Sequence, residues 1–207
     1  MVSVANSTPS SALMHCLIVI ETNSAVNNTR EMLDSLLSVD RIVSPYESVC
    51  ERYFQHKYYI NEDNDGCDQL VLFHSNRVCL ITLSPNHCIL KQDKRMKNID
   101  FNISDAVNRL DNKVSGKWKK GGQRVSPESI LCRIECENNE TFDIKCCLNG
   151  TIVEINNNLL KDMDLIKQKT FSDGFIAIIL PFRGKHQSEK DSLLSPQQYR
   201  ELLDNKL

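Results

Sequence analysis

Residues 150–166 read GTIVEINNNLLKDMDLI, and residues 173–181 read DGFIAIILP. The first stretch alternates apolar and polar side chains from Thr151 to Ile155, which predicts a half-buried strand. The second places an apolar run directly after Asp173-Gly174, which predicts another strand preceded by a turn. A Leu-rich turn is predicted between the two. These residues therefore indicate a β-rich domain.

Five further runs of β-branched and apolar residues occur before this region, and turn-forming residues separate them. Short strands at such spacing are typical of a barrel or a sandwich, so the chain is expected to be mainly β. The five runs are Leu70–Phe73, Val78–Leu83, Ile99–Ile103, Ile130–Cys136 and Phe142–Leu148.

One short pattern occurs twice. Residues 114–118 read VSGKW and residues 148–152 read LNGTI, and each is apolar, small polar, glycine, polar, apolar. Two copies are too few for a solenoid, and they indicate two interlocked halves around one core within residues 70–183. In that arrangement Gly116 and Gly150 would lie at equivalent turns.

Composition and the positions of the predicted strands divide the chain into three parts. Residues 1–47 open Ser-, Asn- and Thr-rich and include a possible helix after Thr29, and they are expected to form a poorly ordered extension. Residues 48–183 are the expected barrel domain. Residues 184–207 are expected to form a linker and a C-terminal amphipathic helix.

The C-terminal helix has a clear start signal. Ser195 can cap it, Pro196 occupies the first helical position, and Gln198 completes a capping box. Its apolar stripe consists of Tyr199 and two leucines, Leu202 and Leu203. Such stripes usually face a core, so docking on the barrel is expected, and partner binding is the alternative.

The composition excludes several classes of partner. The 207 residues carry 25 Lys and Arg against 27 Asp and Glu, and a net charge of −2 does not draw the whole chain to nucleic acid or to anionic lipid. The apolar run from Leu13 to Ile20 is far shorter than the ~20 residues of a membrane helix, and no basic residue precedes it. We expect no membrane attachment and no specific nucleic-acid partner.

The chain has nine cysteines, an odd number, and no C-x-x-C pair. Cys132 and Cys136 flank Ile134 in an alternating run, which puts all three on one face of a strand. Cysteine as a small core hydrophobe therefore explains them better than a zinc site does. We expect all thiols to be free, in a reducing compartment.

Neither a catalytic nor a cation-binding motif is complete. Asn61-x-Asp63-x-Asp65-Gly66 imitates the start of a calcium loop, but the twelfth position is Leu72 where a glutamate is needed. His74-Ser75 and His87-Cys88 are adjacent pairs, and neighbours on a strand face opposite ways. No phosphate-binding loop occurs. The sequence thus predicts no catalytic residue, no metal and no cofactor.

Residues 113–124, KVSGKWKKGGQR, form the most basic stretch. Cations beside an aromatic residue suit phosphates, single strands or an acidic protein surface. A solvated turn with ordinary lysines is an equally good interpretation, and Trp118 could instead lie inside the barrel in the position of Ile152. The predicted partner-binding residues are Lys117, Trp118, Lys119, Lys120 and Arg124.

The region from Gly150 onward resembles the glycine-cleavage H protein, whose fold is a flattened lipoyl/biotinyl-type β-barrel of two hammerhead halves. In that family a hairpin lysine about ten residues before this glycine carries lipoate. The corresponding turn here, Glu137 to Glu140, has no lysine, and Lys145 lies in a predicted strand. The resemblance implies the fold and not the carrier function.

A closer resemblance, to the Abitram (Simiate) family, extends over about residues 48–203. It rests on CERYFQHKYY (50–59), FHSNRVCLITL (73–83), RLDNKVSGKWKKG (109–121), LCRIEC (131–136), GTIVEINNNLL (150–160), DGFIAIILP (173–181) and LLSPQQYRELL (193–203). It implies a non-enzymatic actin-binding protein that modulates actin polymerisation and transcription. It also implies a location in the nucleus, including speckles, and in the cytoplasm, including filopodia and dendrites.

Two alternatives stay open. One is a scaffold without a prosthetic group that binds other nuclear or cytoplasmic proteins through its tail helix. The other is a vestigial acyl-carrier domain or an unrecognised enzyme. Actin, in its monomeric or filamentous form, is the partner that the resemblance implies.

Overall fold

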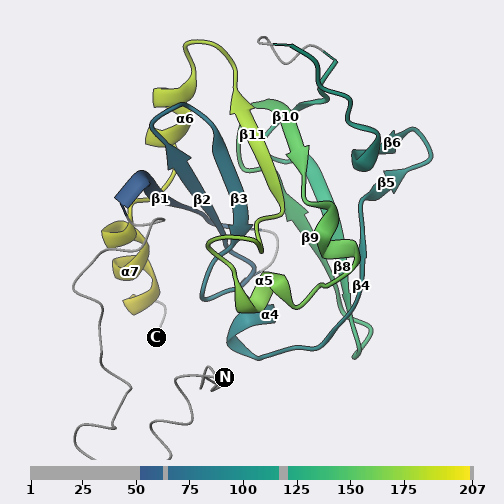
Figure 1. Ribbon diagram of the computed structural model, residues 1–207. Coiled ribbons are helices and arrows are strands. Elements are labelled where there is room, and N and C mark those ends of the chain that lie inside the picture. Colours follow the sequence, from purple (N-terminus) through teal and green to yellow (C-terminus); the bar gives the residue numbers. More distant parts are fainter. Residues whose placement is uncertain (1–51, 63–64, 117–120, 206–207) are drawn as a thin grey trace, which may run out of the picture. The chain divides into compact units, whose positions relative to one another are not determined.

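The computed structural model describes residues 52–62, 65–116 and 121–205. The predicted extension 1–47, with its possible helix after Thr29, lies outside the described residues. So do Lys117, Trp118, Lys119 and Lys120. The described part is mainly β, with antiparallel sheets and a few short helices (Figure 1).

One antiparallel sheet has six strands. In spatial order they are β1 (Phe54–Tyr59), β2 (Gln69–His74), β3 (Cys79–Leu83), β11 (Ala177–Pro181), β10 (Gly150–Ile155) and β7 (Arg124–Val125). The two strands predicted within residues 150–166 and 173–181 both form. They are β10 and β11, and they are direct neighbours in the sheet. Their register shifts between Ile152 and Glu154, where a bulge bends the strand.

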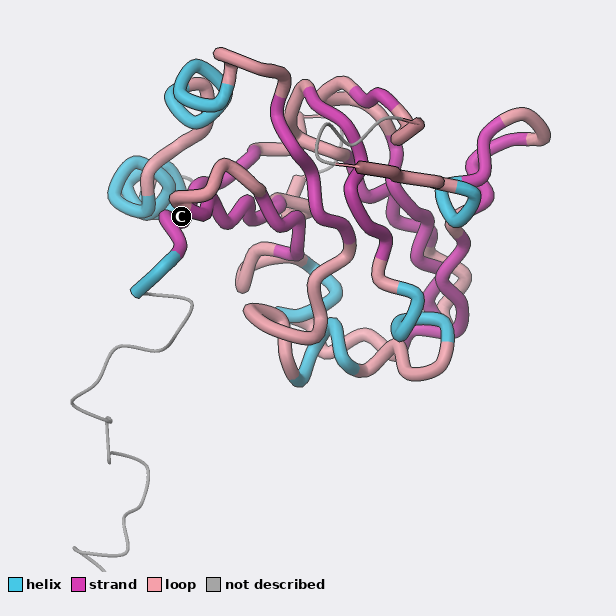
Figure 2. The backbone as a smooth tube through the Cα atoms, turned by 45° about the horizontal axis from the view of Figure 1, so that its top comes forward, coloured by secondary structure: helices cyan, strands magenta, loops and turns pink. Residues whose placement is uncertain are grey.

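A second sheet has three antiparallel strands, β4 (Met96–Asp100), β8 (Ile130–Cys136) and β9 (Thr141–Lys145), in the order β4-β8-β9. It lies behind β10 and β11 in the view of Figure 1, and the tilted view of Figure 2 shows the same two layers. Strands β5 (Asn102–Ser104) and β6 (Val107–Asn108) form a separate small hairpin.

Short helices connect the strands or flank them. They are α4 (Cys88–Lys91), α5 (Leu165–Gln168), α6 (His186–Asp191) and α7 (Pro196–Asp204), with 3-10 turns η3 (Arg109–Asp111) and η4 (Asn157–Leu160). Helix α7 packs beside the edge strand β1. None of the helices in the described residues is long and apolar enough to cross a membrane.

The core lies between the two sheets, because each contributes alternate side chains to it. Val71 and Phe73 come from β2, and Cys132, Ile134 and Cys136 come from β8. The prediction that these three β8 residues share a buried face is confirmed. The described cysteines, Cys67, Cys79, Cys88, Cys132, Cys136, Cys146 and Cys147, are all free.

Three predictions about local structure were wrong. The run Ile99–Ile103 was expected to be one strand, but β4 ends at Asp100 and β5 begins at Asn102, in another sheet. The run Phe142–Leu148 was expected to be one strand, but β9 ends at Lys145, because Cys147 has a φ of 65° that no strand accommodates. Gly116 and Gly150 are not equivalent either. Gly116 lies in a turn with a φ of 66°, whereas Gly150 opens β10 and is paired with both Pro181 and Val125.

The predicted start of the C-terminal helix is confirmed. Ser195 accepts the amide of Gln198 at 3.3 Å, and the Gln198 side chain accepts the amide of Ser195 at 2.8 Å. Pro196 occupies the first helical position. This reciprocal pair fixes the point at which the chain turns into α7. Helix α6 lies in the segment that was predicted to be a linker.

Candidate partner-binding site

A buried arginine anchors the residues that flank the basic stretch 113–124, which is called the basic segment below. Arg109, which is 8% exposed, donates from Nε to the carbonyl of Ile130 at 3.0 Å and from Nη1 to Gln123 Oε1 at 2.8 Å. Gln123 in turn donates from Nε2 to the carbonyl of Asn108 at 2.6 Å. Burial lowers the pKa of Arg109, but a guanidinium stays charged in proteins. Arg109 thus joins Gln123, near the C-terminal end of the segment, to the residues just before the segment.

Two further contacts tie the segment to β10. Asn112 accepts the amide of Gln123 at 2.8 Å and donates to the carbonyl of Ile152 at 3.0 Å. The amide of Ile152 donates to the carbonyl of Gln123 at 2.9 Å. The residues on either side of the segment are therefore held together through hydrogen bonds to a core strand.

Glycines are needed where the segment returns to the sheet. Gly121 has a φ of 85°, and a Cβ there would lie 2.6 Å from the carbonyl oxygen of Lys113. A Cβ on Gly122 would lie 2.5 Å from the Thr151 methyl group. Only glycine allows so close an approach of the backbone.

Arg124 is the one residue of the predicted site that the structure describes. It lies on β7, the last strand of the six-stranded sheet, paired with Thr151, and it is exposed. The role of Arg124 in binding an acidic partner remains a prediction. The contribution of the neighbouring Lys117, Trp118, Lys119 and Lys120 remains a prediction.

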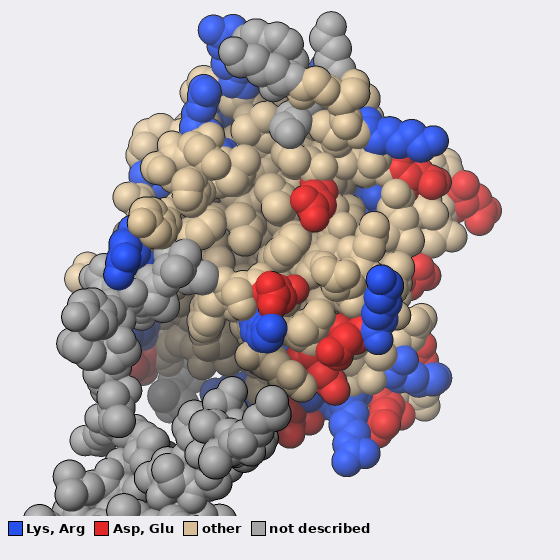
Figure 3. Space-filling model, viewed as in Figure 1, with Lys and Arg blue, Asp and Glu red and all other residues tan. Residues whose placement is uncertain are grey.

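The charge on the face shown in Figure 3 has a different character. Much of that face is uncharged, and the Lys, Arg, Asp and Glu side chains toward its lower right lie close to one another. Ion pairs join such residues, among them Lys167 with Asp93 at 2.7 Å and Lys97 with Glu135 at 2.8 Å. Mixed charges of this kind solubilise a surface and do not select an acidic partner.

The tail helix uses its apolar stripe within the fold. Tyr199 is 3% exposed, and its ring stacks on Tyr58 of β1 with centroids 4.1 Å apart. Its hydroxyl donates to Asp68 Oδ2 at 3.0 Å and lies 3.1 Å from Ser84 Oγ, and burial raises its pKa to about 12. Docking of the helix on the rest of the domain was the expected outcome, and it is confirmed for the side of α7 that carries Tyr199.

The hairpin that would carry a prosthetic group is the β8–β9 turn. The amide of Asn139 donates to the carbonyl of Cys136 at 3.0 Å, and Asn139 has a φ of 61° at the turn. The turn residues are Glu137, Asn138, Asn139 and Glu140. A carrier arm needs a primary amine, and none projects from this turn.

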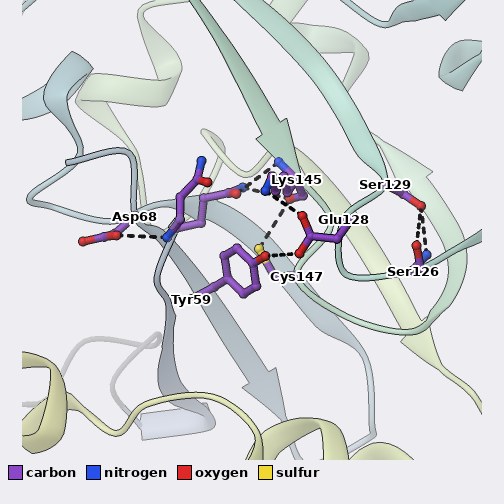
Figure 4. Close-up of polar contacts among 9 residues, drawn as sticks. Tyr59, Asp68, Ser126, Glu128, Ser129, Lys145 and Cys147 are labelled. Atoms are coloured by element: carbon purple, nitrogen blue, oxygen red, sulfur yellow. Dashed lines mark hydrogen bonds and ion pairs between the residues drawn. The ribbon is translucent and has the colours of Figure 1, made fainter. Parts of the chain in front are cut away.

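The first lysine after this turn, Lys145, is held in place by other side chains. Figure 4 shows the side chains of Lys145 and Tyr59 both directed at the carboxylate of Glu128. Lys145 Nζ lies 2.6 Å from Glu128 Oε2, and the Tyr59 hydroxyl donates to Oε1. Burial, together with that hydrogen bond, raises the pKa of Tyr59. Only 11% of the Lys145 side chain is exposed, so it is no flexible arm.

We expect that the chain is not a substrate for lipoyl or biotinyl ligases. The full chain would be co-expressed with each ligase in cells supplied with the vitamin, and its intact mass would equal that of the unmodified sequence. A glycine-cleavage H protein treated identically is the positive control. A discrete mass increment on this chain, lost when Lys145 is changed to Arg, would contradict the assignment.

Sequence reasoning missed the residues that organise this site. Arg109 opens the RLDNKVSGKWKKG stretch and Gln123 lies within the basic segment, yet neither was predicted to be structural. An arginine is usually exposed, so composition alone gives no reason to bury it. An available signal was the position of both residues at the ends of one glycine-containing loop.

The chain is similar to the glycine-cleavage H proteins. The model of the family described as Glycine cleavage H-protein matches residues 92–206. A solved glycine cleavage system H protein from Mycobacterium marinum superimposes with a TM-score of 0.48 at 13% sequence identity, over 73% of this chain and 97% of that one.

Several relatives are similar over most of their length. Protein Abitram of Danio rerio is 41% identical over 157 residues, which cover 75% of this chain and 89% of that protein. Protein Abitram of Homo sapiens is 36% identical over 75% of this chain and 87% of its own length, and that of Dictyostelium discoideum is 31% identical over the same shares. The chain therefore belongs to the Abitram family and has a fold of the glycine cleavage H-protein type.

Proposed function

We propose that this protein is a non-enzymatic actin-binding protein that modulates actin polymerisation and transcription. The proposed locations are the nucleus, including speckles, and the cytoplasm, including actin-rich projections. The support is membership of the Abitram family together with the absence of a lysine from the carrier turn. A fold that lacks its carrier amine is left with its surfaces as functional elements.

The observation that carries the proposed contact is the anchoring of the basic segment by Arg109. Fixing the residues that flank a loop before it binds removes part of the entropy that binding would otherwise cost. Actin is acidic, so cations held near the edge of the sheet would accelerate encounter and favour one orientation. A tryptophan in such a contact would supply the buried aromatic area on which interfaces depend.

Reversal of three charges tests the segment. In the full chain, Lys117→Glu, Lys119→Glu and Lys120→Glu together are expected to weaken actin binding at low salt by at least about tenfold, because steering becomes repulsion. Co-sedimentation with filamentous actin over a range of protein concentrations measures the change. The difference from the wild type should shrink as salt rises, since exposed charges are screened.

The matched control reverses three exposed cations elsewhere, Lys161, Arg183 and Lys185, so that the net charge changes by the same amount. Circular dichroism and thermal unfolding would show that both triple variants remain folded. If the two variants bind actin equally, net charge rather than the basic segment determines the affinity, and the proposed site is wrong.

A further inference from the structure

Two thiols and an imidazole lie together at one end of the six-stranded sheet. The Sγ atoms of Cys67 and Cys88 are 3.4 Å apart, and Nδ1 of His87 lies 3.8 Å from the Cys88 Sγ. One ligand atom from each residue lies within 4.8 Å of the other two, and the described residues contain no other cluster of three such side chains. These thiols and this imidazole have no part in the proposed actin contact.

The β2–β3 hairpin brings the three residues together. Gln69 at the start of β2 is paired with Leu83 at the end of β3, so the residues before one and after the other are neighbours. Backbone hydrogen bonds extend this closure, from Ser84 to Asp68 at 3.2 Å and from Cys88 to Gly66 at 2.7 Å. The relative positions of the three side chains are therefore fixed by backbone pairing on both sides.

The spacing suits a tetrahedral cation. With Zn–S bonds of about 2.3 Å and Zn–N bonds of about 2.0–2.1 Å, tetrahedral angles place two sulfurs about 3.8 Å apart and a sulfur and a nitrogen about 3.6 Å apart. The observed 3.4 Å and 3.8 Å differ from these distances by a few tenths of an ångström. Small side-chain rotations can supply such changes without moving the backbone.

The imidazole is able to turn toward the thiols. His87 is fully buried, its Nδ1 accepts the amide of Ile89 at 3.2 Å, and its Nε2 has no hydrogen-bond partner among the described residues. The nitrogen nearest the thiols is Nδ1, so metal binding would exchange the Ile89 amide for the cation and leave the ring proton on Nε2. The ring is held by a single long hydrogen bond, so its reorientation sacrifices little.

The surroundings combine an aromatic ring with charges of both signs, because Lys94 is paired with Glu140 and the carboxylate of Asp68 lies next to Cys67 in the chain. Phe142 lies edge-on to the His87 ring with centroids 5.9 Å apart, and Lys94 Nζ lies 5.0 Å from the centre of the Phe142 ring. Cys67 is 5% exposed and Cys88 is half-buried, so the cluster retains one route to solvent. Thiolates are soft ligands that suit a soft cation, and the cation itself would balance most of the negative charge of two thiolates.

We propose that Cys67, His87 and Cys88 bind a thiophilic d10 cation, Zn²⁺ or Cu⁺. Binding displaces the proton from each thiol to solvent and forms two metal–sulfur bonds and one metal–nitrogen bond. Neither the metal nor the sulfur changes oxidation state. Three protein ligands satisfy Cu⁺, whereas Zn²⁺ would add a fourth ligand from solvent on the half-buried side of Cys88.

Cobalt is the first probe, because Co²⁺ occupies zinc sites and reports thiolate ligation directly. The reduced, chelator-treated full chain would be titrated with Co²⁺. We expect sulfur-to-cobalt charge-transfer absorption in the near ultraviolet that saturates at one equivalent and disappears when Zn²⁺ is added. The Cys67→Ala, Cys88→Ala double variant should lose this absorption, whereas a Cys132→Ala control, which removes a buried thiol of β8, should keep it.

A second measurement identifies the cation. Competition with a chromogenic Cu⁺ chelator under anaerobic conditions gives the affinity for Cu⁺, and the Zn²⁺ competition above gives that for zinc. Bound metal should also raise the thermal unfolding temperature of the wild type and of Cys132→Ala, but not that of the double variant. Circular dichroism of the metal-free proteins would show that all three are folded.

Two outcomes would overturn the proposal. One is charge-transfer absorption that persists in the double variant, which would place the metal on other cysteines. The other is the absence of such absorption from the wild type in excess Co²⁺, together with no retention of Cu⁺ against the chelator. In that case the two thiols are core side chains in simple contact.

Discussion

Gly174→Ala is expected to destabilise the folded domain by about 3–5 kcal/mol, the upper range for a single substitution. A Cβ at this position would lie 2.1 Å from the carbonyl oxygen of Leu165 and 2.8 Å from that of Lys169. Both are backbone atoms at or beside α5, so no flexible side chain can move aside.

The backbone around Gly174 is also unable to retreat. Asn156, which is 3% exposed, donates from Nδ2 to the carbonyls of Asp173 and Phe175, each at 2.7 Å. A shift of Gly174 would break these hydrogen bonds and leave a buried amide without partners, which adds about 1–3 kcal/mol. Asn156 and Gly174 lie in the two stretches, 150–166 and 173–181, from which the β-rich fold was predicted.

Urea unfolding followed by circular dichroism measures this loss. Gly184→Ala is the matched control, because Gly184 has a φ of 78° and open space around it. Alanine there should lower the free energy of unfolding by only about 1–2 kcal/mol, since its sole cost is the left-handed backbone conformation. If the two alanine variants unfold at the same urea concentration, the close packing of Gly174 against α5 does not limit stability.

Arg109→Ala is expected to cost about 3 kcal/mol, because it removes two charge-assisted hydrogen bonds and leaves their acceptors unsatisfied. The acceptors are the carbonyl of Ile130 and the side chain of Gln123. A local effect should accompany the global one. The basic segment should become more sensitive to trypsin in the folded protein, because Gln123 loses one of the hydrogen bonds that hold it to the residues before the segment.

Arg133→Ala provides the comparison for this second prediction. Arg133 Nε lies 3.0 Å from Asp143 Oδ1, but both side chains are more than 40% exposed, so the pair should contribute no more than about 1 kcal/mol. Arg109→Lys should fall between the two alanine variants, since an ammonium cannot reach both acceptors. If Arg133→Ala is less stable than Arg109→Ala, burial of an arginine does not determine how much its contacts contribute to stability.

Alternation predicted the strands well where one face is buried. β8 has the bounds expected, Ile130–Cys136, because its apolar positions recur at every second residue. β1 was not predicted as a strand, because its residues FQHKYY mix aromatic and charged side chains without alternation. Helices α4 and α5 have four residues each, too few for a helical period to show.

Interactions between distant parts of the chain explain what the sequence could not indicate. The cluster of Cys67, His87 and Cys88 depends on the register of the β2–β3 hairpin, and its cysteines lie too far apart for a zinc-motif search to find. The resemblance of the segments around Gly116 and Gly150 was misleading for the same reason. Local pattern does not determine which residues a strand has as neighbours.

Quantitative co-sedimentation of the wild-type full chain with filamentous actin tests the central claim most directly. The claim is that this member of the Abitram family acts by binding actin and not by carrying a prosthetic group. We expect saturable binding at low salt that weakens as salt rises, with no pelleting of the chain when actin is omitted. The same amount of chain in the pellet with and without actin, at every concentration and salt tested, would contradict it.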